Sequence, residues 1–222
     1  TTSGTQTYTG AVTLAANIAL DSTANSNNGA ISFSSTVNSA NSTARNLTVT
    51  AGSGNVTFTG AVGNTYALGA LVVNSNVVLA APVVINANTA TFASAITGGT
   101  NTALTITASG GINLGGNVST SGSQTYNNDI TLTNSLEMNS SAGNIVKNTH
   151  SLFSAAITHL APDDAGFITP EIVITKEVGK INPLYSINLL TMQSSNQTAY
   201  IGNIKVAGEI NTFMDQDYRT NT

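Results

Sequence analysis

Several residue types that commonly stabilise or equip a protein are rare or missing in this chain. Its 222 residues include no cysteine and no tryptophan, and only 7% of them are charged. The absence of cysteine excludes disulfides and thiolate metal ligands. The net charge of −4, with no basic cluster to neutralise phosphates, argues against a nucleic-acid partner. No apolar run is long enough to span a bilayer, so we expect a chain that is not membrane-embedded.

What the chain has instead is short segments in which apolar and polar residues alternate. Ile31–Phe33, Leu47–Thr50, Val56–Thr59, Leu104–Thr107 and Ile130–Leu132 all follow this period of two. Alternation of this kind predicts half-buried β-strands, and Val, Ile, Thr and Phe suit a pleated surface. The best helical segment is Ser151–Leu160, although its beginning also fits a strand.

Glycine, asparagine and serine fill the intervals between these segments. Examples are Asn25–Gly29, Gly52–Asn55 and Gly98–Asn101. These residues tolerate positive φ angles or bond to their own backbone, so we predict turns there.

The segments also echo one another at fixed distances along the chain. The sequence from Ser3 to Leu14 returns, with substitutions, from Ser121 to Leu132. A shorter echo, at about half that distance, relates Leu47–Ala51 to Leu104–Ala108. Such self-similarity is typical of repeat architectures, in which each unit buries its apolar face against the next.

Together, short strands and internal repeats favour a solenoid over a sandwich or a barrel. We predict an all-β, parallel β-helix with coils of about 20–25 residues, forming a single elongated domain. The scarcity of charge agrees, because stacked like charges repel whereas stacked Asn and Thr can bond to each other. The predicted core positions of the repeats are Tyr8, Val12, Leu14, Val56, Phe58, Val62, Ile112, Leu114, Tyr126, Ile130, Leu132, Ile172 and Ile174.

The charged residues are unevenly distributed along the chain. Residues 1–148 contain only Asp21, Arg45, Asp129, Glu137 and Lys147, whereas residues 149–222 contain all the others. We interpret residues 1–148 as regular solenoid repeats. We interpret residues 149–222 as a divergent continuation that ends in a cap or tail, because a polar end blunts an open sheet edge.

The motif at residues 3–14, with its copy at 121–132, resembles the repeats of filamentous-haemagglutinin-like and autotransporter-passenger adhesins, which are large bacterial surface exoproteins. The resemblance covers about residues 3–132 well and 170–210 weakly. It implies a right-handed β-helix, an extracellular or cell-surface location, and a role in adhesion or biofilm. Since Thr1–Gly4 already lie within a repeat motif, we expect the chain to be a segment of a longer protein.

The polar residues do not assemble into a recognisable reaction centre. Asp163–Asp164 and Asp215 with Asp217 are the close carboxylate pairs, and each reads as a turn or a tail. His150 and His159 lack a third ligand nearby in the sequence. We therefore predict no catalytic, metal or cofactor site.

Three functional hypotheses follow from the sequence. The first is a non-enzymatic structural or adhesive stalk, whose partners are neighbouring repeats of its parent protein and a host-cell or matrix surface. The second is a self-assembling filament subunit, joined to further copies of itself through the solenoid ends. The third is a carbohydrate-active β-helix enzyme, which would need a groove carrying at least two carboxylates.

Overall fold

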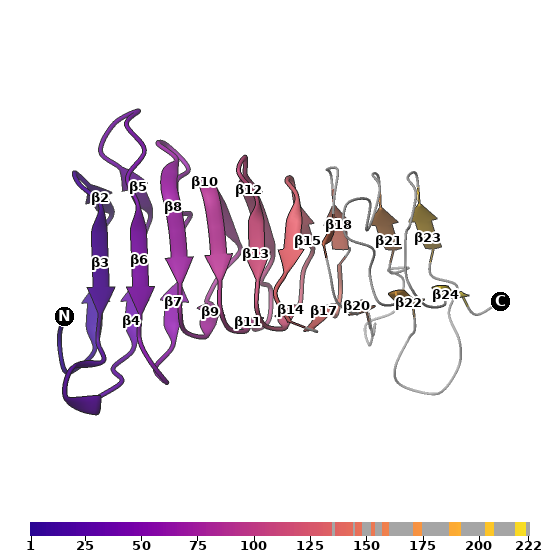
Figure 1. The fold of residues 1–222 in the computed structure, drawn as a ribbon, viewed down its shortest axis with the longest axis horizontal. Coiled ribbons are helices and arrows are strands. Elements are labelled where there is room, and N and C mark those ends of the chain that lie inside the picture. The colour runs from indigo at the N-terminus through magenta and orange to yellow at the C-terminus, as the bar shows by residue number, and fades with distance from the viewer. Residues whose placement is uncertain are drawn as a thin grey trace.

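The computed structural model shows an all-β chain whose parallel strands stack as a β-solenoid (Figure 1). It describes residues 1–134, 136–143 and 145–147, and beyond these the backbone of six further strands. Residues 1–147 make about seven turns. The predicted fold class is therefore confirmed.

The turns of the solenoid run through three faces, and most of the described turns contribute one strand to each face. Face 1 is the ten-stranded sheet. Its strands are β1 (Gln6–Tyr8), β4 (Ile31–Phe33), β7 (Val56–Phe58), β9 (Val77–Leu79), β11 (Ile96–Gly98), β14 (Val118–Thr120), β17 (Leu136–Ser140), β20 (Ile157–His159), β22 (Ile187–Thr191) and β24 (Gln216–Thr220).

Faces 2 and 3 are joined through β10 (Val83–Phe92), which runs across the corner between them. The other strands of face 2 are β2 (Val12–Leu14), β5 (Val37–Ser39), β12 (Leu104–Ala108), β15 (Gln124–Tyr126), β18 (Ile145–Lys147), β21 (Glu171–Ile174) and β23 (Asn203–Val206), with Val62 bridging β5 to β10. The other strands of face 3 are β3 (Ile18–Asp21), β6 (Leu47–Thr50), β8 (Leu68–Val73), β13 (Ile112–Leu114), β16 (Ile130–Leu132) and β19 (Leu152–Phe153).

We call one passage through faces 1, 2 and 3 a coil, so that coil 1 is β1, β2 and β3. On face 1, Gln6 pairs with Ile31 and Ile31 pairs with Val56, and these are the longest steps from one coil to the next on that face among residues 1–143. The pairing of Val77 with Ile96 is the shortest step on that face. The chain therefore returns to face 1 after about 20–25 residues, as the sequence predicts.

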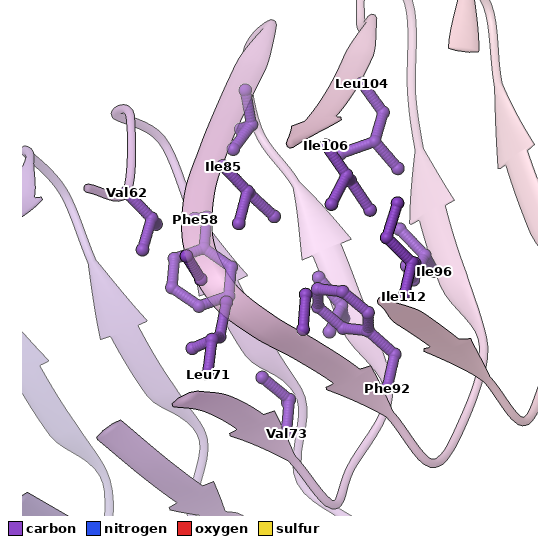
Figure 2. Packing of buried hydrophobic residues seen from close by; sticks show 14 of the residues in the cluster. Phe58, Val62, Leu71, Val73, Ile85, Phe92, Ile96, Leu104, Ile106 and Ile112 are labelled. Atoms are coloured by element: carbon purple, nitrogen blue, oxygen red, sulfur yellow. The ribbon is translucent and has the colours of Figure 1, made fainter. Parts of the chain in front are cut away.

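The core is a continuous column of apolar side chains inside the three faces (Figure 2). Alternation along each strand sends every second side chain inward, and stacking places like residues above one another. The rings of Tyr8, Phe33 and Phe58 form such a ladder on face 1, with centroids 5.2 and 5.3 Å apart. Stacked rings at this spacing add about 0.5–1.5 kcal/mol per pair beyond the area they bury.

The three turns predicted from Gly, Asn and Ser each contain a residue with positive φ. Asn25 has a φ of 57°, Gly52 of 57° and Asn101 of 58°. The helix considered at Ser151–Leu160 is wrong, because β19 and β20 lie within that segment. The short 3-10 helix η1 (Ala24–Ser26) lies instead in the corner after β3.

The sequence echoes do not span whole numbers of coils. Gln6–Tyr8 lies on face 1 of coil 1, whereas its copy Gln124–Tyr126 lies on face 2 of coil 6. Leu47 likewise lies on face 3 of coil 2, whereas Leu104 lies on face 2 of coil 5. Each echo therefore repeats a whole number of strand-and-corner units, and the two copies end on different faces.

Charged residues become more frequent after residue 149, and the side chains of that part of the chain lie outside the described residues. The backbones of β20, β22 and β24 continue face 1 beyond that point, and β21 and β23 continue face 2.

Candidate functional site

The predicted core positions lie on the inner sides of the strands. Nine of them are buried, with exposed fractions between 0% and 3%: Leu14, Val56, Phe58, Val62, Ile112, Leu114, Tyr126, Ile130 and Leu132. Tyr8 and Val12 are half-buried and pack against the same core, since they belong to coil 1 at its open end. Ile172 and Ile174 lie on β21 in register with β18, and their side chains are outside the described part.

A polar network inside the core is the feature that the core prediction missed. The Tyr126 hydroxyl donates a 2.9 Å hydrogen bond to Oε1 of Gln124. Nε2 of Gln124 donates to the backbone oxygen of Asn139 at 2.6 Å and to Oγ1 of Thr120 at 3.2 Å. Both Gln124 and Tyr126 are completely buried. Burial raises the pKa of the Tyr126 hydroxyl far above its ordinary value, because phenolate cannot be solvated there.

The first copy of the motif makes the same bonds. The Tyr8 hydroxyl donates to Oε1 of Gln6 at 3.0 Å. Nε2 of Gln6 donates to Oγ1 of Thr2 at 3.0 Å and to the backbone oxygen of Asp21 at 2.9 Å. In both copies the glutamine bonds a backbone oxygen 15 residues further on, in the second strand after its own, and so ties together two strands that meet at a corner of the solenoid. The echo in the sequence therefore encodes a corner clamp, and the recurrence of Gln at both sites was the signal for it.

Outward side chains link neighbouring coils by hydrogen bonds between Asn and Thr. Nδ2 of Asn127 donates to Oγ1 of Thr107 at 2.8 Å, and Nδ2 of Asn113 donates to Oγ1 of Thr91 at 3.1 Å. Asn74 bonds Thr50 in the same way at 3.0 Å. This is the bonding between stacked Asn and Thr that the low charge content suggested.

The carboxylates with described side chains lie on separate coils. Asp21 ends β3 on coil 1, Asp129 lies at the corner before β16 on coil 6, and Glu137 lies on β17 of coil 7. Thr23 donates two hydrogen bonds of 2.7 Å to Oδ1 of Asp21, and these lower the pKa of that carboxyl group. Within the described residues, no three His, Asp or Glu side chains gather as a metal site would require. Asp163, Asp164, Asp215, Asp217, His150 and His159 have no described side chains.

A second polar feature is the pair of loops at the corner between faces 2 and 3. Residues 40–46 form this corner in coil 2, and residues 63–67 form it in coil 3. Arg45 belongs to the first loop, and its Nε is buried without a hydrogen-bond partner among the described residues. Tyr66 belongs to the second loop and is 43% exposed, the most exposed large hydrophobic residue described.

No protein-family model, curated protein or solved structure matches this chain. The fold defines the class of protein, which is a parallel β-solenoid, and residues 1–147 carry only five charged side chains. No helix in the described part is long and apolar enough to cross a membrane.

Proposed function

We propose that the chain is a non-enzymatic, rigid stalk segment of a secreted or surface-attached bacterial exoprotein that serves in adhesion or biofilm. The observation that carries the proposal is the bonding between coils along the rod. Neighbouring coils in the described part are joined by parallel strand pairing and by the shared apolar core, and outward Asn–Thr hydrogen bonds add links between coils 2 and 3, coils 4 and 5, and coils 5 and 6. The proposed location is extracellular, and the resemblance of the repeats to bacterial surface adhesins supports that location.

Such a rod resists bending and proteolysis for physical reasons. Buried backbone groups are paired across coils, so local opening of one coil must break the bonds to both neighbours. The core is continuous, with Val56, Phe58 and Val62 all fully buried in one coil. Proteases cleave most readily at exposed loop tips, so cleavage within the paired strands requires local unfolding.

Small-angle scattering of the purified chain tests the stalk. The ten strands of face 1, spaced by about 4.8 Å, predict a rod on the order of 45 Å along its axis. A pair-distance distribution skewed as for a rod, together with slow cleavage by a nonspecific protease, supports the proposal. A compact, spherical profile or rapid cleavage within residues 1–143 would overturn it. Antibodies against the chain should label the outside of intact cells that produce the parent protein.

A self-assembling filament subunit is the second candidate, and the open edge of coil 1 favours it. Gln6 and Val12 donate their backbone N–H groups to coil 2. In a parallel strand the intervening residues, Thr7 and Thr13, therefore direct their backbone groups to the open side. Ile18 on the same edge is 37% exposed. An edge of this kind accepts either a preceding coil of a longer chain or a second copy.

Electron microscopy across a concentration series distinguishes the filament from the stalk. Fibres of uniform width that lengthen with concentration support end-to-end assembly. Isolated rods at all concentrations contradict it and leave the stalk proposal standing. Replacing Thr13 by Pro gives a matched variant, because proline removes one backbone donor from the open edge and should shorten the fibres.

A further inference from the structure

The two loops at the corner between faces 2 and 3 of coils 2 and 3 form one surface, which we call the corner platform (residues 40–46 and 63–67). The loop after β5 projects beyond the strands at the upper edge of the rod (Figure 1). The exposed residues of this loop are Ala40, Asn41, Ser42, Thr43 and Asn46, and those of the second loop are Asn64, Thr65, Tyr66 and Ala67.

The platform is fixed to the solenoid rather than free to move. Buried Ser39 bonds to both loops. Its N–H donates to the backbone oxygen of Tyr66 at 3.2 Å, and its Oγ accepts from the N–H of Arg45 at 2.9 Å. Oγ of Ser39 also donates to the backbone oxygen of Ala67 at 2.8 Å. A surface held by several bonds loses little conformational entropy when a ligand binds.

Further bonds join the ends of the loops. The N–H of Thr65 donates to Oδ1 of Asn38 at 2.9 Å. The N–H of Gly69 donates to the backbone oxygen of Arg45 at 2.8 Å, and the N–H of Ala70 donates to Oδ1 of Asn46 at 2.8 Å. The two loops therefore keep the coil-to-coil spacing of about 4.8 Å, which is comparable with the length of a pyranose ring.

The platform holds two residues that are exceptional for this rod. Arg45 is the only Lys or Arg in residues 1–146. Its Nε is buried without a partner among the described residues, so an anion beside the platform bonds to the terminal Nη groups of the guanidinium. Tyr66 presents an exposed aromatic ring on the adjacent coil.

We propose that the corner platform binds a saccharide that carries a carboxylate, such as a uronic acid residue. The planar guanidinium of Arg45 matches the two oxygens of a carboxylate. The negative face of the Tyr66 ring attracts the C–H groups on one side of a sugar. Asn41, Asn64 and Thr65 supply amide and hydroxyl groups for the sugar hydroxyls.

The surroundings favour a saccharide over an acidic peptide. A peptide anchor usually needs an apolar pocket for its side chains, and the exposed residues of the platform are mostly amides and hydroxyls. The flanking strands also carry Thr and Asn outward, so a longer glycan could continue along the rod. This inference rests on the adhesive part of the proposed function and not on its stalk part.

Binding of trigalacturonate, measured by NMR chemical-shift changes on the whole chain, tests the proposal. We expect saturable shifts centred on residues 40–46 and 63–67, and no comparable shifts with the neutral sugar maltotriose. Arg45→Gln and Tyr66→Ala should each weaken binding at least tenfold, and Arg45→Lys should retain part of it. Thr97→Ala, at an exposed position on face 1, is the matched control and should bind like the unaltered chain.

The outcomes separate this inference from the stalk proposal. Absence of trigalacturonate binding, or binding that neither Arg45→Gln nor Tyr66→Ala weakens, overturns the saccharide site. Equal binding of a hexaglutamate peptide also overturns it, because the surface would then recognise charge alone. A rod-shaped scattering profile in either case keeps the stalk, and unchanged circular dichroism shows that the variants are folded.

Discussion

Tyr126 and Gln124 are joined by a hydrogen bond of 2.9 Å in the centre of the solenoid, and Tyr8 and Gln6 are joined by the equivalent bond at its open end. The two pairs lie on different faces, yet each glutamine bonds a backbone oxygen 15 residues further along the chain. The Gln–Tyr pair therefore closes one corner of a coil, and it does so at different corners of the solenoid.

Replacing Gln124 by Ala should lower the free energy of unfolding by about 1–3 kcal/mol, because the Tyr126 hydroxyl and the Asn139 carbonyl then lack a buried partner. Chemical denaturation measures the change. Gln6→Ala is the matched control: it removes equivalent bonds at a half-buried position, where water can replace them. An equal loss in both variants would contradict the argument that burial makes the clamp important.

Tyr126 makes stability sensitive to alkaline pH. Its folded-state pKa is raised by burial, so its contribution is complete below the ordinary tyrosine pKa of about 10 and is lost as pH rises above that value. We expect the free energy of unfolding to fall above about pH 10. Tyr126→Phe should be less stable at neutral pH, because Oε1 of Gln124 loses its donor, and should decline less steeply with pH. An identical alkaline slope in the variant would count against this assignment.

The aromatic ladder on face 1 should be the most sensitive part of the apolar core. Phe58 is fully buried and its ring stacks on Phe33, 5.3 Å away between centroids. Phe58→Ala should lower the free energy of unfolding by about 3–5 kcal/mol through lost burial and the cavity that remains. Thr57→Ala, on the outer side of the same strand, should change it by less than about 0.5 kcal/mol. Thermal and denaturant unfolding of both variants would check the contrast.

Gly63 occupies a position that only glycine fits well. Its φ is +71°, its N–H donates to the backbone oxygen of Val37, and an added Cβ would collide with the backbone oxygen of Asn86. Gly63→Ala should therefore cost at least about 1–3 kcal/mol of stability. Gly10→Ala should be tolerated, since open space surrounds that position. Gly10→Ala therefore serves as the control, and equal melting temperatures of the Gly63→Ala and Gly10→Ala variants would refute the prediction.

Local patterns in the sequence were enough to predict the strands and the turns. Val56–Thr59 and Ile130–Leu132 alternate, so only one side of each could be apolar and buried. Asn25, Gly52 and Asn101 lie in segments whose residues tolerate positive φ, and each adopts it. These features depend on a few neighbouring residues and on the difference between apolar and polar side chains.

Which face each strand occupies was decided only by the tertiary structure. The Gln-Thr-Tyr strand fits face 1 at residues 6–8 and face 2 at residues 124–126, because any three-residue alternating strand can pair with the coil beside it. The number of residues in the preceding corners decides which face a strand reaches. No local sequence pattern contains the sum of these corner lengths over several coils. The corner platform was hidden for the same reason: Arg45 and Tyr66 lie in separate segments, and only the stacking of coil 2 on coil 3 brings their loops to the same serine.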